Sequence, residues 1–254
     1  MKIGLIQYSP VWENPKETIK IIEALITSVD LSDVSLLIFP EMSLTGFTMS
    51  SKIFAEEIDG VSFTYFMQLS RRLKKHIFAG IIEKDEKDVY NSLIHFDNNG
   101  LIRVVYRKIH PFSFAKEDKN FKAGNETIIT KVNNVTFGLS ICYDLRFPEL
   151  YRQYGKKRAD VLINIANWPV ARIQHWDILL QARAIENQCY MIGVNRIGDD
   201  PFLEYPGHSA GVNPMGEILN LNFAESISII EIDVEKVKTL RETLPFLDDM
   251  KMIK

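Results

Sequence analysis

The stretch of sequence that decides the fold is VTFGLSICYDLRFPELYRQY, residues 135–154. Its first seven residues, Val135–Ile141, are apolar and predict a buried β-strand. Phe147–Tyr154 predicts a short helix, with Pro148 near its start, where proline is favoured. Cys142 therefore lies in a turn between a strand and a helix. Units of this kind, repeated along a chain, build α/β folds.

Outward from this stretch, strand-like and helical segments alternate. The further strands that we expect are Lys2–Tyr8, Ser35–Phe39, His76–Ile82, Val89–Phe96, Leu101–Tyr106, Thr127–Lys131, Val161–Ile165, Tyr190–Asn195, His208–Asn213, Glu217–Leu221 and Ile227–Ile232. The further helices are one beginning near Asn14, and Phe54–Lys75, Arg172–Gln188 and Val234–Leu240. Hairpin turns at 97–100 and 133–134 add antiparallel pairs. The sequence predicts an α/β or α+β fold with a mixed sheet.

Composition narrows the class of protein. The chain has 254 residues, 46% of them hydrophobic and 25% charged, which is typical of one globular domain. A net charge of −3 argues against a dedicated nucleic-acid-binding protein. No apolar run approaches the roughly 18 residues of a membrane span, and the N-terminal decapeptide resembles a strand rather than a signal peptide. Two cysteines cannot form a disulfide framework, so we expect a reducing, cytoplasmic setting.

Cys142 is the first candidate for chemistry. Backbone N–H groups at the start of the helix that follows it would favour a thiolate and could hold an oxyanion. The alternative is a small buried core cysteine, which is how we interpret Cys189. None of the five histidines, His76, His95, His110, His175 and His208, has a pattern that marks it as the base of such a thiol, and none has metal-ligand spacing.

Two charged residues that follow apolar strands are further candidates. Glu41 comes directly after the buried run 36–40, where desolvation would raise its pKa toward that of a general base. Its alternative role is that of a helix or turn cap. Lys108 follows the strand-like run 101–107 and, taken alone, is an ordinary strand-end lysine.

The segment Gly207–Gly211, GHSAG, matches the G-x-S-x-G pattern of serine hydrolases. That pattern requires a helix directly after it and a histidine later in the chain. Here a strand and a turn follow, and no histidine comes after His208. We therefore expect Ser209 to be a strand residue near a pocket or in the core.

Taken together, these segments resemble the nitrilase superfamily of carbon–nitrogen hydrolases. The resemblance rests on 39–42 (FPEM), 106–110 (YRKIH) and 140–149 (SICYDLRFPE), which are similar to its glutamate, lysine and cysteine motifs. Segments 167–169, 175–176, 181–188, 205–209 and 213–217 are similar to its bacterial ω-amidase-like branch. The resemblance implies a single-domain αββα sandwich that dimerises. The catalytic core would span about 1–232, and 233–254 would serve packing or dimer contacts.

The resemblance also implies roles for individual residues. Glu41 would be the base, Cys142 the nucleophile, and Lys108 with the backbone N–H of Tyr143 the oxyanion site. The family has a second glutamate, which we match to Glu117, although the adjacent Asp118 stays open.

Three more residues would bind substrate. Arg146 would contact a substrate carboxylate, the alternative being a salt bridge to Asp144 or Glu149. Asn167 and Trp168 would form the pocket wall, although Trp168 could equally belong to the core.

The implied activity is hydrolysis of small 2-oxo-acid amides, 2-oxoglutaramate and 2-oxosuccinamate, to a dicarboxylate and ammonia, with no metal or organic cofactor. A deaminated-glutathione amidase and an N-carbamoyl amine hydrolase stay open as other branches. A non-catalytic dimeric binding protein of the same fold is the competing class.

Overall fold

Two mixed β-sheets form the centre of the protein in a computed structural model, which describes residues 1–221 and 226–251. The first sheet has the strand order β13-β1-β2-β3-β4-β5. Its strands are β1 (Lys2–Ile6), β2 (Val34–Ile38), β3 (His76–Asp85), β4 (Asp88–Phe96), β5 (Ile102–Arg107) and β13 (Ile227–Glu231). β1, β2 and β3 are parallel, and the other pairings are antiparallel.

The second sheet repeats this plan with five strands in the order β12-β9-β8-β7-β6. They are β6 (Ile129–Val132), β7 (Val135–Ile141), β8 (Val161–Ala166), β9 (Tyr190–Asn195) and β12 (Ala210–Val212). β7, β8 and β9 are parallel, and β6 and β12 pair antiparallel at the two edges. A separate hairpin joins β10 (Ile197–Asp199) to β11 (Glu204–Pro206). The expectation of a mixed sheet is therefore confirmed.

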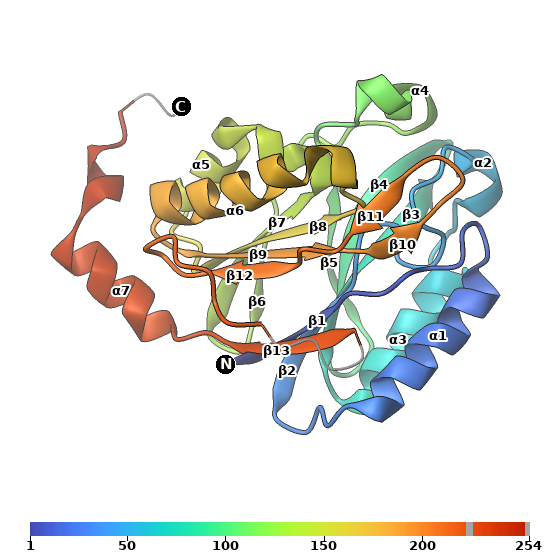
Figure 1. Cartoon of the computed structure of the whole chain (residues 1–254), viewed down its shortest axis with the longest axis horizontal. Helices are drawn as coiled ribbons and strands as arrows, with labels where there is room; N and C mark the ends of the chain where they lie inside the picture. Colours follow the sequence, from blue (N-terminus) through green and yellow to red (C-terminus); the bar gives the residue numbers. More distant parts are fainter. Residues whose placement is uncertain (222–225, 252–254) are drawn as a thin grey trace.

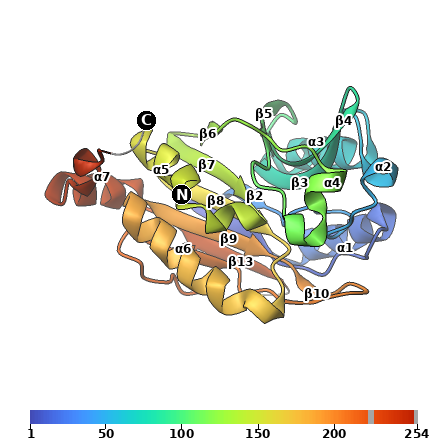
Figure 2. The ribbon, with the colours of Figure 1, turned by 90° about the horizontal axis from the view of Figure 1, so that it is seen from above.

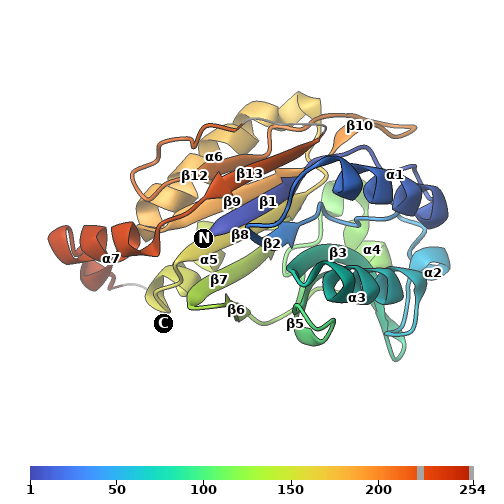
Figure 3. The same ribbon diagram turned by 90° about the horizontal axis from the view of Figure 1, so that it is seen from below.

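Helices cover the outer face of each sheet, which gives four layers (Figure 1). α1 (Pro15–Ser28) and α3 (Val61–Leu73) pack on the first sheet, and α5 (Pro148–Lys156) and α6 (Ile173–Asn187) pack on the second (Figures 2 and 3). Between the sheets, branched and aromatic side chains such as Ile38, Phe78, Phe137 and Ile163 are fully buried in one core. The resulting αββα sandwich is the fold that the motifs implied.

Short helical segments complete the described chain: α2 (Ser51–Phe54), α4 (Glu117–Asn120), α7 (Val234–Thr243), and the 3-10 turns Ser113–Ala115, Cys142–Arg146, Val170–Arg172 and Phe246–Asp249. Asn14 accepts a hydrogen bond from the backbone N–H of Glu17, so it caps α1 as its sequence predicted. On α6, the predicted stripe is buried at Trp176, Leu180 and Ala184. No helix in the described ranges is long and apolar enough to cross a membrane.

The helix expected over Phe54–Lys75 is wrong at its start, because residues 55–60 do not form it. The chain at 55–60 is not helical, because the backbone of Glu56 pairs with β3: its N–H donates to Ile82 and its carbonyl accepts from Lys84. α3 begins only after Gly60, and the Glu56 carboxylate accepts from the N–H of Ser62 in its first turn.

The expected strand Glu217–Leu221 is also wrong within the part of the chain that is described. Only Ile218 makes a bridge, to Val212. The side chain of Asn213 accepts hydrogen bonds from the N–H groups of Met215 and Glu217, which makes a tight turn there instead.

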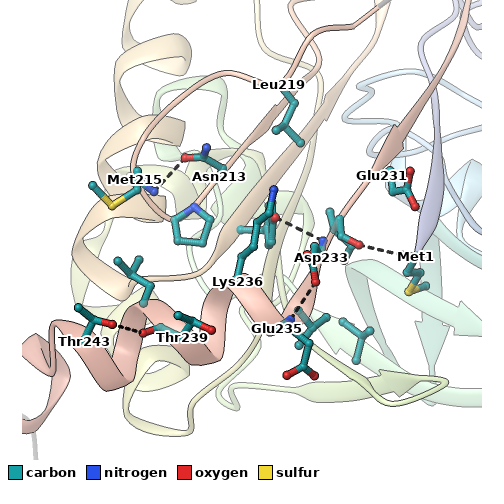
Figure 4. A pocket seen from close by; sticks show the side chains of 16 residues that line it. Met1, Asn213, Met215, Leu219, Glu231, Asp233, Glu235, Lys236, Thr239 and Thr243 are labelled. Carbon is teal, nitrogen blue, oxygen red and sulfur yellow. Dashed lines mark hydrogen bonds between the residues drawn. The ribbon is translucent and has the colours of Figure 1, made fainter.

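α7 projects away from the sandwich (Figure 1). Val237 is the one residue of this helix that is fully buried. An open groove of about 1080 Å³ lies between α7 and the loop that carries Asn213 and Met215. Figure 4 shows Lys236 and Thr239 on the helix side of this groove and Met215 and Leu219 on the other.

Candidate active site

Four segments that are distant in sequence bring their charged or nucleophilic side chains to one end of the two sheets. Glu41 follows β2, Lys108 follows β5, Glu117 begins α4, and Cys142 follows β7. Glu41, Lys108 and Glu117 are each at most 1% exposed. The ends of parallel strands meet at one edge of a sheet, which is why strand-end residues converge here.

Lys108 joins the two buried carboxylates. Its Nζ donates to Oε1 of Glu41 at 2.8 Å and to Oε1 and Oε2 of Glu117 at 3.0 and 2.9 Å. Buried carboxylates are costly unless they are paired, so this lysine is what permits two of them in one site. The charges of Glu117 and Glu41 outweigh the effect of burial and raise the pKa of Lys108 well above its usual value, which keeps it protonated.

Two asparagines and one backbone N–H group donate further hydrogen bonds to this cluster. Nδ2 of Asn91, on β4, donates to Glu41 at 2.7 Å and to Glu117 at 2.8 Å. The backbone N–H of Asn167, which follows β8, donates to Oε2 of Glu41 at 2.9 Å, and its side chain also binds Glu41. The backbone N–H of Phe112 donates to Glu117 at 2.6 Å. Both carboxylates are therefore fixed in position before any substrate arrives.

These contacts drive the pKa values of the two glutamates in opposite directions. Burial by itself would raise the pKa of Glu41, but the charge of Lys108 and the hydrogen bonds from Lys108 and Asn91 hold it below its usual value. Burial and the charge of Glu41 raise the pKa of Glu117 despite the same lysine. The expectation that desolvation would raise the pKa of Glu41 is wrong, since an ion pair offsets it.

Cys142 is half-buried and has a φ of 44°, a backbone conformation that is uncommon for a residue with a side chain. Its Sγ lies 3.9 Å from the carbonyl oxygen of Asn167. Burial and the charge of Glu41 raise the pKa of the thiol well above its usual value, and the opposing effect of Lys108 is smaller. This raised pKa contradicts the expectation that the turn at Cys142 favours a thiolate.

Asp144, which the sequence did not mark, connects the lysine segment to the cysteine turn. Its carboxylate accepts hydrogen bonds from Tyr106 Oη, from the backbone N–H of Ile141, and from both the N–H and the ring Nδ1 of His110. Tyr106 and His110 lie on either side of Lys108 in the sequence. The buried carboxylate of Asp144 therefore fixes the segment that carries Lys108 relative to the turn that carries Cys142.

Gly80 on β3 allows the Glu41 loop to approach this closely. A Cβ at that position would lie 2.5 Å from the backbone nitrogen of Met42 and 2.7 Å from Cα of Glu41. No side chain other than hydrogen fits there without moving the loop.

A pocket of about 170 Å³ opens onto Lys108 and Cys142. The expected substrate-binding residues Arg146, Asn167 and Trp168 line it, as does Tyr143, the expected oxyanion residue. Trp168 is 2% exposed, and its ring nitrogen donates to the carbonyl of Arg172 at 2.7 Å. The rest of the wall is mainly aromatic and includes Phe47, Phe112 and Tyr205.

Arg146 makes no salt bridge with Asp144 or Glu149 in the described ranges. Its guanidinium instead lies 4.7 Å from the centre of the Trp168 ring, and one nitrogen lies 3.2 Å from Nδ1 of His175. The sequence did not single out Arg172, which lines the same pocket.

The structure also distinguishes Glu117 from Asp118 and locates Ser209 and Cys189. Asp118 pairs with the exposed Lys119 at 2.9 Å, whereas its neighbour Glu117 binds Lys108, so Glu117 is the acid that belongs to the cluster. Ser209 donates from Oγ to the carbonyl of Asn195 in a buried position away from the pocket lining. Cys189 is buried in the core. Among the described residues, no group of three His, Cys, Asp or Glu side chains is arranged to hold a metal ion.

Residues 2–242 match the carbon–nitrogen hydrolase family, which covers nearly the whole chain and includes every residue of this cluster. The chain belongs to the carbon–nitrogen hydrolase family. Among its relatives is 2-oxoglutaramate amidase of Bacillus subtilis, 34% identical over 252 residues, or 98% of this chain and 97% of that protein. Omega-amidase YafV of Escherichia coli K12 is 31% identical over 98% of this chain and 96% of its own length.

A solved structure gives the same answer for the fold. A carbon–nitrogen hydrolase superfamily protein from Xanthomonas campestris superposes with a TM-score of 0.92 at 28% identity, over 100% of this chain and 98% of that one. That protein carries an arsenic adduct in its active site. The αββα sandwich and the family are thus established for this carbon–nitrogen hydrolase.

Proposed function

We propose that this protein is an amidase that cleaves the terminal amide of small 2-oxo-acid amides, 2-oxoglutaramate and 2-oxosuccinamate, to a dicarboxylate and ammonia. The observation that carries the proposal is the buried Glu41–Lys108–Glu117 cluster beside the Cys142 thiol, in a pocket that also presents Arg146. The names of the 2-oxoglutaramate amidase and omega-amidase relatives support the substrate class.

The first half of the reaction forms a thioester. Glu41, whose pKa is lowered by Lys108, accepts the Cys142 proton as Sγ attacks the amide carbon. Lys108 Nζ and the backbone N–H of Tyr143 stabilise the oxyanion that develops on the amide oxygen. The C–N bond then breaks and the C–S bond is retained. The proton taken from Cys142 passes from Glu41 to the departing nitrogen, which leaves as ammonia and restores the Glu41 carboxylate.

Glu117 is suited to a different task from Glu41. Because its pKa is raised, it holds a proton more readily than its partner, and a pair of carboxylates with diverging pKa values divides acid and base roles. Glu117 orients Lys108 and assists protonation of the departing ammonia. In the second half, Glu41 takes a proton from water, which attacks the thioester and releases the acid and the Cys142 thiol.

The pocket selects the substrate by size and charge. A cavity of about 170 Å³ suits a molecule with few carbon atoms. Arg146, whose guanidinium lies over the Trp168 ring and has no carboxylate partner in the described ranges, is placed to receive the substrate's carboxylate. Asn167 and Trp168 form the wall beside it.

Ammonia release from a panel tests the proposal. The panel holds 2-oxoglutaramate, 2-oxosuccinamate, deaminated glutathione and N-carbamoyl-β-alanine, with wild type, Cys142→Ala and Arg146→Ala side by side. We expect turnover of the 2-oxo amides that Cys142→Ala abolishes and Arg146→Ala weakens. Turnover of another panel member would move the assignment to that branch. If no substrate of the panel releases ammonia, or if Cys142→Ala keeps the activity, the result would favour a non-catalytic binding protein.

We also propose that two copies of the chain associate through α6. Ile178 and Ile185 on this helix are 64% and 52% exposed, while its opposite face is buried in the sandwich, so two large apolar side chains stand on its outer face. The segment from 233 adds to this contact or to local packing; its last three residues, 252–254, lie outside the described residues. Ile178→Asp combined with Ile185→Asp should shift the mass measured by light scattering to that of a monomer. An unchanged mass would exclude this face.

A cytoplasmic location fits the proposed chemistry. Both cysteines are free, and a nucleophilic thiol must stay reduced to act.

A further inference from the structure

Two arginines, not one, face the candidate pocket. Arg146 and Arg172 both line it, and neither guanidinium lies within salt-bridge distance of a carboxylate in residues 1–221 and 226–251. By contrast, Lys108, the other cation of the pocket, is held by two glutamates. Two unpaired cations are therefore available to a ligand.

Both guanidiniums lie over aromatic rings, and within the described residues only Nη1 of Arg146 has a side-chain partner, His175 Nδ1 at 3.2 Å. The Arg146 group lies 4.7 Å from the centre of the Trp168 ring, and the Arg172 group lies 5.4 Å from that of Phe112. A cation–π contact uses the charge of the guanidinium and leaves its other N–H groups able to bind an oxygen ligand. The backbone of Arg172 is fixed as well, since its carbonyl accepts from the Trp168 ring nitrogen.

The two positive charges also act on each other. Burial, followed by the charge of Arg172, lowers the pKa of Arg146. Placing like charges close together in a partly enclosed pocket is unfavourable unless an anion completes the site. The pocket is thus suited to a ligand that carries negative charge and oxygen acceptors for these two arginines.

We propose that Arg172 is a second substrate-binding residue, which acts with Arg146 as a clamp on the carboxylate and the adjacent 2-oxo oxygen and which disfavours amides that carry an ammonium group at the same carbon. This inference rests on the proposed function and deepens it. It assigns to one residue the choice between a 2-oxo-acid amide and the corresponding amino-acid amide, glutamine.

The chemistry of carbon 2 explains the discrimination. A 2-oxo oxygen accepts a hydrogen bond from a guanidinium, whereas an ammonium group offers only donors and one positive charge. Inside the clamp, glutamine would therefore lose a hydrogen bond and meet two like charges. Specificity of this kind depends on repulsion of the wrong ligand as much as on attraction of the right one.

Kinetics with matched substrates test the clamp. Ammonia release is measured for 2-oxoglutaramate, for glutamine and for pentanamide, which has the same chain length and no charge. Arg172→Gln should raise KM for 2-oxoglutaramate about 10- to 100-fold, the effect of losing a hydrogen bond to a charged group, with a smaller change in kcat. The preference for 2-oxoglutaramate over glutamine should fall, and pentanamide kinetics should stay unchanged. Arg172→Lys keeps the positive charge but loses the planar group with two parallel N–H donors. Its KM for 2-oxoglutaramate should lie between those of wild type and Arg172→Gln.

Arg103→Gln is the matched control. It removes one positive charge from an arginine that is 60% exposed and outside the pocket lining, so it should leave all three substrates unaffected. Equal losses on all three substrates in Arg172→Gln would mean a structural role, and no change would mean that Arg172 does not touch substrate. Either result overturns the clamp.

A binding measurement separates failure of the clamp from failure of the proposed function. We would determine the concentration of 2-oxoglutarate that halves the rate at which iodoacetamide alkylates Cys142, a readout that needs no turnover. Arg172→Gln should raise this concentration about tenfold or more. If wild type does not hydrolyse 2-oxoglutaramate but this shift occurs, the substrate assignment fails and the clamp stands. If turnover occurs without the shift, the clamp fails and the function stands.

Discussion

Glu41 and Glu117 accept hydrogen bonds from the same two groups, the ammonium of Lys108 and the amide of Asn91. Each also accepts one backbone N–H, from Asn167 for Glu41 and from Phe112 for Glu117. The two pKa values nevertheless move in opposite directions, because burial and the charge of Glu41 raise the pKa of Glu117, while the charge of Lys108 holds that of Glu41 low. One lysine and one asparagine thereby hold a base and an acid side by side.

Asn91→Ala tests this shared arrangement. Asn91 lowers the pKa of Glu41, so its removal should raise that pKa and move the acid limb of the kcat/KM profile to higher pH, because the base must be ionised to act. We expect kcat/KM to fall about 10- to 100-fold at neutral pH, as two hydrogen bonds to charged groups are lost. A pH–rate series measures both effects. Asn120→Ala removes an exposed amide and is the control. A lower rate with an unmoved acid limb would contradict this role.

Glu117→Gln and Asp118→Asn distinguish the two adjacent acids. The Glu117 carboxylate accepts from Lys108, Asn91 and the N–H of Phe112, and an amide would place a donor against one of these donors. We expect Glu117→Gln to lower kcat at least 100-fold, a loss typical of a group that takes part in proton transfer. Asp118 pairs at the surface with Lys119, so Asp118→Asn should retain full activity in the same assay. The reverse pattern would exchange the two assignments.

Asp144→Asn tests the connection between the lysine and cysteine segments. The Asp144 side chain is 0% exposed and accepts from three residues, Tyr106, His110 and Ile141. An amide directs two N–H groups at these donors, so we expect a loss of about 2–4 kcal/mol in the free energy of unfolding. Urea titration of both proteins measures it. A loss below about 0.5 kcal/mol, the level of an ordinary surface change, would be inconsistent with this role.

His95 makes stability depend on pH in a region remote from the pocket. It is fully buried between the sheets, 2.8 Å from His76 and 2.7 Å from Thr130, and burial followed by the charge of His76 lowers its pKa from 6.5 to about 3. Between these two values the unfolded chain binds the proton and the folded protein does not. Stability from His95 is therefore present above pH 6.5 and is lost as pH falls toward 3.

Urea unfolding between pH 4.5 and 7.5 checks this dependence. One proton taken up on unfolding corresponds to a slope of about 1.4 kcal/mol per pH unit. His95→Gln removes that proton, so its curve of unfolding free energy against pH should be flatter than that of wild type by about this amount. Parallel curves for the two proteins would show that His95 does not titrate in this way.

The sequence by itself determined the local features. Apolar runs and turn residues placed β1 through β9 to within a few residues, because periodicity and turn chemistry act over short distances. Glu41, Lys108 and Cys142 could be found for a similar reason, since each follows a strand within a compact motif. The prediction failed where a distant segment binds the backbone. Strand β3 hydrogen-bonds to Glu56 and interrupts the helix expected over 54–75.

Only the tertiary structure decided the properties that depend on contacts between distant segments. Glu117 rather than Asp118 belongs to the cluster because of the direction in which a short helix turns beside Lys108. The pKa values of Glu41 and Cys142 moved against expectation, since burial and charge act in opposition and their balance depends on distances that span up to 126 positions of sequence. Arg172 could not be predicted for the same reason, a dependence on distant contacts. No local pattern marks it, and only the fold brings it to the same pocket as Arg146.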